Sequence, residues 1–76
     1  MTATANRKHG ALLTPGVLRR MAGWSQARVA VFAGTGVGLV RIYEIDPLAV
    51  TDLQKRRALA RLYEELREDV LQLPSP

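Results

Sequence analysis

Phe32 to Glu44, "FAGTGVGLVRIYE", is the stretch that decides the fold, because its three glycines within five residues suit either a phosphate-binding loop or a bend between two helices. A dinucleotide-binding loop requires a further glycine at the position of Leu39, and a Walker loop requires a Gly-Lys-Ser/Thr ending that the sequence lacks. Only about forty residues follow Gly36, too few for the remaining strands and helices of a nucleotide-binding sheet. The stretch is therefore predicted to be a bend between short helices.

The residues before the bend have the features of one short helix. Ser25 is a good N-cap, since its hydroxyl can accept a hydrogen bond from a free amide of the first turn. Trp24 and Val29 occupy the positions of a hydrophobic staple, which fixes how the chain enters the helix. Gly34 can adopt the left-handed conformation that ends helices. We predict a helix over residues 26–33.

A second short helix is expected directly after the bend. Its cap is Gly36 or Thr35, and Val40 and Tyr43, three residues apart, lie on one face. The helix should end at about Ile45, because a proline two residues later disfavours helical backbone in the residue that precedes it.

Two further helices are predicted, one on each side. Thr14 and Pro15 form a cap and first-position pair that opens a short helix ending at the next glycine. A capping box of Thr51 and Gln54 opens a helix of about twenty residues, 52 to about 73. Apolar residues recur along this long helix at three- and four-residue steps: Leu59, Leu62, Tyr63, Leu66, Val70 and Leu73. The stripe should pack on the short helices at one end and protrude at the other, where a second copy could cover it.

Length and composition exclude several classes of protein. A chain of 76 residues makes one domain, expected to be an all-α bundle of three short helices and one long helix. We expect residues 1–13 to form a flexible basic leader, residues 14–73 the domain and residues 74–76 a tail. With no cysteine and a single histidine, His9, we expect no metal, no cofactor and no catalysis. No apolar run is long enough to cross a membrane, so a cytoplasmic location is expected.

Charge is distributed unevenly along the chain. Residues 1–43 hold six basic side chains and no acidic one, whereas residues 62–76 hold four acids against Arg67 alone. The first half is the part expected to meet a polyanion, unless its basic residues only form a solvated surface. The long helix reverses the preference of the helix dipole, with basic residues in its first turns and acids toward its end. A phosphate bound at its start would turn that cost into a gain.

The run "GWSQARVAVFAGTGVGLVRIYE", from Gly23 to Glu44, and the helix after it resemble the lambda-repressor-like (Cro/XRE-type) family of helix-turn-helix proteins. The matching positions are Gly23, Trp24, Ser25, Gln26, Ala27, Val29, Ala30, Ala33, Gly34, Val40 and Glu44. The resemblance covers residues 14 to about 66. It implies a sequence-specific DNA-binding transcriptional regulator, most simply a repressor, that acts as a homodimer on double-stranded DNA.

The resemblance also implies roles for particular residues. Gln26, at the start of the first helix of the motif, would donate its amide to a phosphate, and the second helix would lie in the major groove. Arg41 could make a bidentate contact to guanine, and Val37 could contact a thymine methyl group. The complete expected DNA-binding set is Gln26, Arg28, Gly36, Val37, Gly38, Arg41, Ile42, Lys55 and Arg56.

Apolar residues at positions that are polar in the family leave an alternative open. Val31 and Phe32 lie at positions that should be exposed, and the second helix of the motif offers mainly Val37, Leu39 and Ile42. Exposed apolar residues in a group indicate a partner surface. The alternative is a protein-interaction module on a helix-turn-helix scaffold, such as an antitoxin or a phage-type adaptor, that binds a protein partner through Val31 and Phe32.

Overall fold

The computed structural model describes residues 13–72, which form four α-helices and one 3₁₀ turn, with no strand among these residues. The elements are α2 (Pro15–Met21), α3 (Gln26–Ala33), α4 (Val37–Ile45), η1 (Pro47–Ala49) and α5 (Leu53–Leu71). The predicted all-α fold of three short helices and one long helix is confirmed. Apart from Leu13, the expected leader and tail lie outside the described residues, as does Leu73. Within residues 13–72, no helix has the length and apolarity needed to span a membrane.

α3 has the predicted bounds and the predicted caps. The hydroxyl of Ser25 accepts a hydrogen bond from the backbone N–H of Arg28, 3.0 Å away. Gly34 lies in the left-handed region, with φ 71°, and its N–H donates to the carbonyl of Val31. A side chain at that φ would strain the backbone, so the glycine is what allows the chain to turn here.

α4 follows after three residues, 34–36, and ends where the proline predicts. Gly36 is its N-cap, which settles the choice between Gly36 and Thr35. Asp46 is extended, with φ −157°, as expected of a residue before proline. The turn η1 was not predicted from the sequence. Asp46 is its N-cap, and the Asp46 side chain accepts a hydrogen bond from the N–H of Leu48 at 3.1 Å.

The caps of α2 and α5 differ from the predictions in detail. Thr14 is the N-cap of α2 ahead of Pro15, but its side chain makes no capping hydrogen bond. The capping box of Thr51 and Gln54 is wrong. The cap of α5 is Asp52, whose carboxylate accepts from the N–H of Lys55 at 3.1 Å, and the helix begins one residue later than predicted. An ionised carboxylate is a stronger acceptor than a threonine hydroxyl, which favours the later start.

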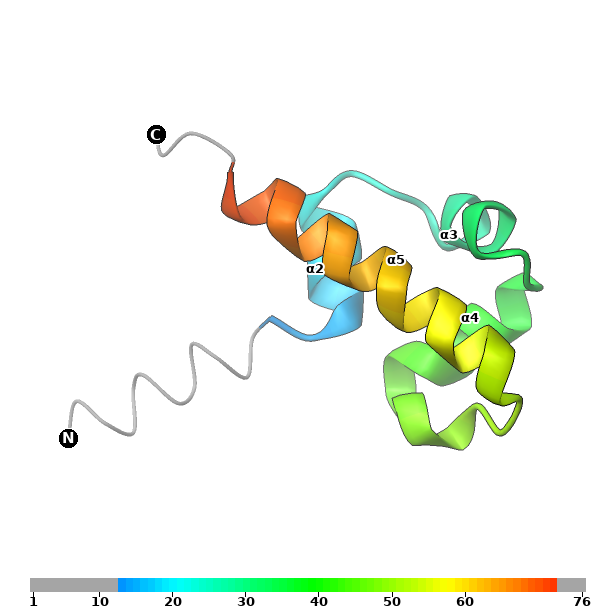
Figure 1. Cartoon of the computed structure of the whole chain (residues 1–76). Helices are drawn as coiled ribbons and strands as arrows, with labels where there is room; N and C mark the ends of the chain where they lie inside the picture. Colours follow the sequence, from blue (N-terminus) through cyan, green and yellow to red (C-terminus); the bar gives the residue numbers. More distant parts are fainter. Residues whose placement is uncertain (1–12, 73–76) are drawn as a thin grey trace, which may run out of the picture.

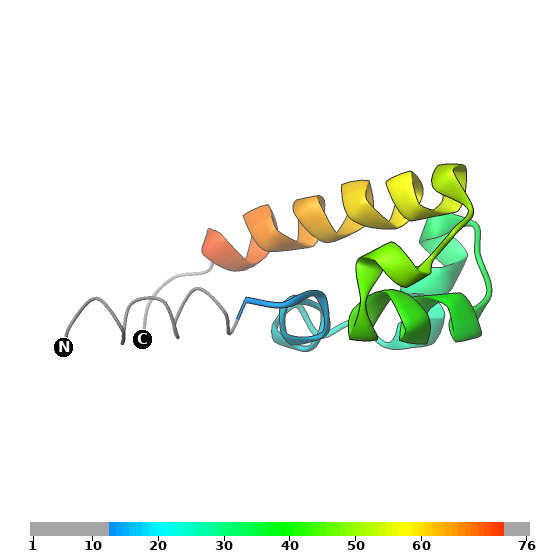
Figure 2. The same cartoon turned by 90° about the horizontal axis from the view of Figure 1, so that it is seen from below.

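α5 forms one layer of the molecule and the shorter helices form the other (Figures 1 and 2). α2, α3 and α4 all contact it, and α3 also packs against α4. The largest side chains that are fully enclosed by these contacts are Val29, Val40, Val50, Leu59 and Leu66. Beside them the rings of Tyr43 and Tyr63 stack at 5.3 Å. The core therefore lies between α5 and the two helices of the motif.

The apolar stripe of α5 does not protrude as the sequence suggested. Leu66 and Val70, toward the end of the helix, are buried like Leu59 near its start. α2 packs against α5, so the first helix of the fold covers the part of the stripe that was expected to remain open. A second copy is therefore not needed to bury these residues.

Candidate nucleic-acid interface

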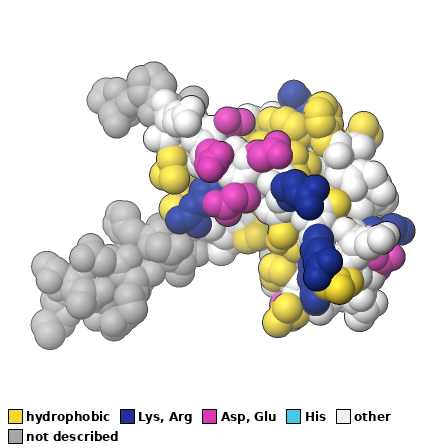
Figure 3. All heavy atoms as spheres, viewed as in Figure 1, with side chains coloured by type: hydrophobic (Ala, Val, Ile, Leu, Met, Phe, Trp, Pro, Cys, Tyr) yellow, Lys and Arg dark blue, Asp and Glu magenta, His cyan; other side chains and the backbone are white. Residues whose placement is uncertain are grey.

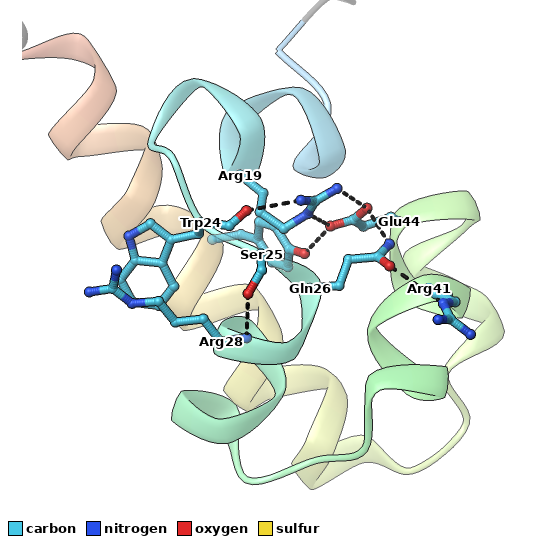
Figure 4. A network of polar contacts seen from close by, with 8 residues as sticks. Arg19, Trp24, Ser25, Gln26, Arg28, Arg41 and Glu44 are labelled. Carbon is cyan, nitrogen blue, oxygen red and sulfur yellow. Dashed lines mark hydrogen bonds and ion pairs between the residues drawn. The ribbon is translucent and has the colours of Figure 1, made fainter.

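A network of hydrogen bonds centred on Glu44 holds the motif together (Figure 4). Its carboxylate accepts from Arg19 Nε at 2.6 Å and Nη2 at 3.3 Å, from Gln26 Nε2 at 3.1 Å and from the hydroxyl of Tyr63 at 2.5 Å. Arg19 Nη1 also donates to the carbonyl of Trp24 at 2.9 Å. These bonds join α2, α3, α4 and α5 at one point.

The charges in this network stabilise one another. The side chains of Arg19 and Glu44 are only 11% and 10% exposed, and they form the one ion pair between residues of the described part. Burial alone would raise the pKa of Glu44, but the hydrogen bonds from Arg19, Tyr63 and Gln26 together lower that pKa below its ordinary value. The hydrogen bond to Glu44 raises the pKa of Arg19 despite its burial. Both groups are therefore held in their charged forms.

From the sequence, Glu44 was expected only as a position of the family pattern, and no contact with Arg19 or Tyr63 was predicted. One signal was present: Glu44 is the first acidic residue of the chain, and it follows six basic ones. A lone acid on a helix that also carries buried Val40 and Tyr43 needs a basic partner. Which arginine supplies it depends on the packing of α2 against α4, which no local pattern specifies.

Gln26 and Arg41 lie together at the expected surface. The Gln26 amide nitrogen donates to Glu44, so one of its two N–H groups is used within the chain and the other bonds to no described residue. Its carbonyl oxygen accepts from Arg41 Nε at 3.4 Å. The guanidinium of Arg41 points away from the network in Figure 4, and its terminal nitrogens bond to no other described residue.

The start of α4 lies open on the same motif. Gly36, Val37 and Gly38 are exposed, as is Ile42 one turn further along. A methyl group added to either glycine would meet no atom within 4 Å. This end of α4 is consequently accessible to a large partner without any rearrangement of neighbouring side chains.

Arg28 does not join this surface. Its guanidinium lies 4.0 Å from the centre of the Trp24 ring, and the Phe32 ring meets Trp24 edge-on at 5.0 Å. Figure 4 shows Arg28 and Arg41 on opposite sides of the motif. The expected DNA-binding residues therefore do not share one surface. Gln26 and Arg41 lie together, whereas Arg28 lies on the other side in a cation–π stack with Trp24.

The two basic residues expected on α5 lie near its start. Lys55 is exposed, while Arg56 is partly buried close to the hydroxyl of Tyr43. Burial raises the pKa of that tyrosine, and the nearby charge of Arg56 opposes the rise. The carboxylate of Asp52 already supplies a negative charge at this helix start. A phosphate is thus not required to compensate the basic residues there.

The most exposed of the large apolar side chains lie at two further places. Val31 is 77% and Phe32 64% exposed at the end of α3, as the sequence suggested. Ile45 and Leu48, between α4 and α5, are also exposed, and no pattern in the sequence distinguished them. Among the described residues, no group of histidine, cysteine and acidic side chains is arranged to hold a metal ion.

No protein-family model, no curated protein and no solved structure matches this chain.

Proposed function

We propose that the protein is a sequence-selective DNA-binding transcriptional regulator, a repressor that binds double-stranded DNA through α3 and α4. The contact that carries the proposal is the hydrogen bond from Arg41 to Gln26, since it joins side chains of the two motif helices on one exposed surface. A phosphate donor next to a guanine-binding side chain is the combination that a helix-turn-helix needs in the major groove.

The glycines of α4 support the same proposal. Gly36 has φ −89° and Gly38 lies within the helix, so neither is required by a left-handed backbone. Gly38 lowers the helix propensity of α4 by about 1 kcal/mol relative to alanine, and nothing packs against it. A helix start without side-chain bulk can approach a ligand closely. Val37, between the two glycines, is then the side chain placed to contact a thymine methyl group.

Phosphate contacts are proposed for Gln26, Lys55 and Arg56, with Arg41, Val37 and Ile42 toward the bases. Arg28 would contribute only if it left the Trp24 ring. These contacts would fix the position of the protein, while the bases would set sequence preference. The excess of basic residues in the first half of the chain attracts a polyanion to this part of the molecule.

The proposal is tested by selecting bound duplexes from a random pool and then titrating the selected duplex at several salt concentrations. We expect the logarithm of affinity to fall linearly with the logarithm of salt concentration, with a slope of about 0.9 for each neutralised phosphate. Arg41→Ala should reduce discrimination at one base pair by about 1 to 3 kcal/mol. It should change the salt slope by no more than the amount that one phosphate contact contributes. Fluorescence anisotropy with matched and mismatched duplexes measures both quantities.

Arg67→Ala is the control, because Arg67 is exposed on α5 and makes no hydrogen bond to another described residue. It should leave sequence preference intact. Binding that is indifferent to salt, or unchanged preference in Arg41→Ala, would contradict the proposal.

The exposure of Val31 and Phe32 favours a second candidate, a protein-interaction module of the antitoxin or adaptor type. Such a module uses the apolar end of α3 and has no need of a duplex. The same titration separates the two functions, since the module would recover no preferred sequence from the random pool.

A further inference from the structure

We propose that two copies of this chain pair antiparallel along the outer face of α5, with the exposed ends of their α3 helices meeting beside the two-fold axis. This pairing would be the interface of the homodimer that is expected of a DNA-binding regulator, and to that extent it rests on the proposed function. It uses none of the residues proposed to contact DNA, so it can fail or succeed separately from the proposed function.

A shallow pocket of about 200 Å³ lies between the end of α3 and the middle of α5. Its lining combines apolar side chains with one basic and one acidic residue, and comprises Phe32, Ala33, Ala58, Arg61, Leu62 and Glu65. Figure 3 shows hydrophobic side chains gathered over α3 beside it. Covering such a pocket, together with exposed Val31 and Phe32, would remove apolar surface from water.

Charge along α5 identifies the occupant as a second copy. On its outer face basic residues lie toward the start, with Arg57 and Arg61 exposed, and mostly acidic ones lie toward the end, with Glu65 and Glu68 exposed (Figure 3). This order opposes the dipole of the helix itself. An antiparallel copy presents the opposite order, so each helix meets charges of the other sign along its length.

The two charged residues that line the pocket are exposed and available for this pairing. Arg61 and Glu65 are four residues apart, a spacing expected from the sequence to give a surface pair, yet they form no ion pair with each other. In an antiparallel arrangement Arg61 faces the partner's Glu65, and symmetry repeats the contact. A parallel arrangement would instead bring Arg57 against the partner's Arg57.

The position of the pocket fits the same symmetry. It lies near the middle of α5, so a two-fold axis perpendicular to the helix at that point brings both pockets together. Such an axis leaves the two α3 helices on the same side of the α5 pair. Phe32 of each copy then lies beside the partner's Phe32, and the charged stripes flank this apolar centre, as in protein interfaces generally.

Two double variants test the charge pairing. Arg57→Glu with Arg61→Glu makes the outer face of α5 acidic, and Glu65→Lys with Glu68→Lys makes it basic. Sedimentation equilibrium should give a concentration-dependent dimer for the natural chain and about tenfold or more weaker association for each variant alone. An equimolar mixture of the two variants should restore dimers. A natural chain that stays monomeric at millimolar concentration, or variants that associate like it, would overturn the proposal.

Cysteine cross-linking tests the direction of the helices, because the chain has no cysteine of its own. Gln54→Cys and Gln72→Cys place single thiols near the two ends of α5. Oxidation should link the two variants when they are mixed, whereas self-linked Gln54→Cys would indicate parallel helices and contradict the inference. Circular dichroism checks that each variant folds, and binding of a half-site duplex by the charge variants shows that DNA binding is a separate property.

Discussion

Glu44 is the residue through which the four helices depend on one another, because its carboxylate accepts hydrogen bonds from Arg19, Gln26 and Tyr63. These partners come from α2, α3 and α5, whereas Glu44 belongs to α4. Gly16 of α2 lies against the same carboxylate, where an added methyl carbon would come within 3.2 Å of Oε1. Half-buried Gln26 and exposed Arg41 are positioned by this largely enclosed carboxylate.

Glu44→Gln should destabilise the fold by about 1 to 3 kcal/mol, because it leaves the largely enclosed charge of Arg19 without an ionised partner. The effect should depend on pH. Folding lowers the pKa of Glu44, so its stabilising contribution is fully present above the ordinary value of 4.5 and is lost as pH falls through the lower pKa of the folded state. Urea unfolding at several pH values measures both effects, and the variant should lose less stability than the natural chain below pH 4.5.

Glu64→Gln is the matched control, since Glu64 is exposed and has no hydrogen bond to another described residue. Its free energy of unfolding should stay within about 0.5 kcal/mol of the natural value. If both variants behave alike, the network contributes nothing specific.

At the scale of the elements, the start of α5 shows a local competition between two caps. Thr51 and Asp52 are adjacent, and the structure uses Asp52. Its carboxylate also offsets the basic residues Lys55, Arg56 and Arg57 at the positive end of the helix dipole. Val50, just before, is fully buried and fixes where the chain can turn.

Asp52→Ala should lower the free energy of unfolding by about 1 kcal/mol, because it removes the bond to the Lys55 amide and the favourable charge at this helix end. Thr51→Ala should cost less than half as much, since the Thr51 side chain makes no capping bond. Thermal unfolding of the two variants compares them directly. Equal losses would mean that the threonine caps the helix in solution.

The sequence predicted the helices well because their ends depend on neighbouring residues. Ser25, Gly34 and the proline after Asp46 act within one turn of the chain, and the bounds of α3 and α4 followed from them. The network around Glu44 could not be predicted, because Arg19 is 25 residues away and meets it only after α2 packs. The packing of α2 also covers the stripe of α5, which is why the stripe was wrongly expected to protrude.

At the scale of the whole molecule, two exposed surfaces have different composition. The motif surface carries Gln26 and Arg41 together with the open start of α4. The other surface joins the end of α3, with Val31 and Phe32, to the outer face of α5. If the first binds DNA and the second binds another copy, each copy of the dimer contributes one half-site contact.

Phe32→Ser should separate the two surfaces. We expect it to leave affinity for a single half-site unchanged and to lower affinity for an inverted repeat about tenfold or more, because only the repeat benefits from dimerisation. Leu71→Ser is the control, since Leu71 is equally exposed, at 63% against 64%, but does not line the pocket. Electrophoretic mobility shifts on both duplexes measure this, and an equal loss on the half-site would place Phe32 in DNA binding instead.

The shared carboxylate of Glu44 also bears on how this small protein comes apart. A helix that detached alone would leave a charged or polar group of the network without its partner in a poorly hydrated place. Partial opening is therefore nearly as costly as complete opening. The four helices should be lost in a single cooperative step, which keeps a chain of this length from exposing its valines and leucines one segment at a time.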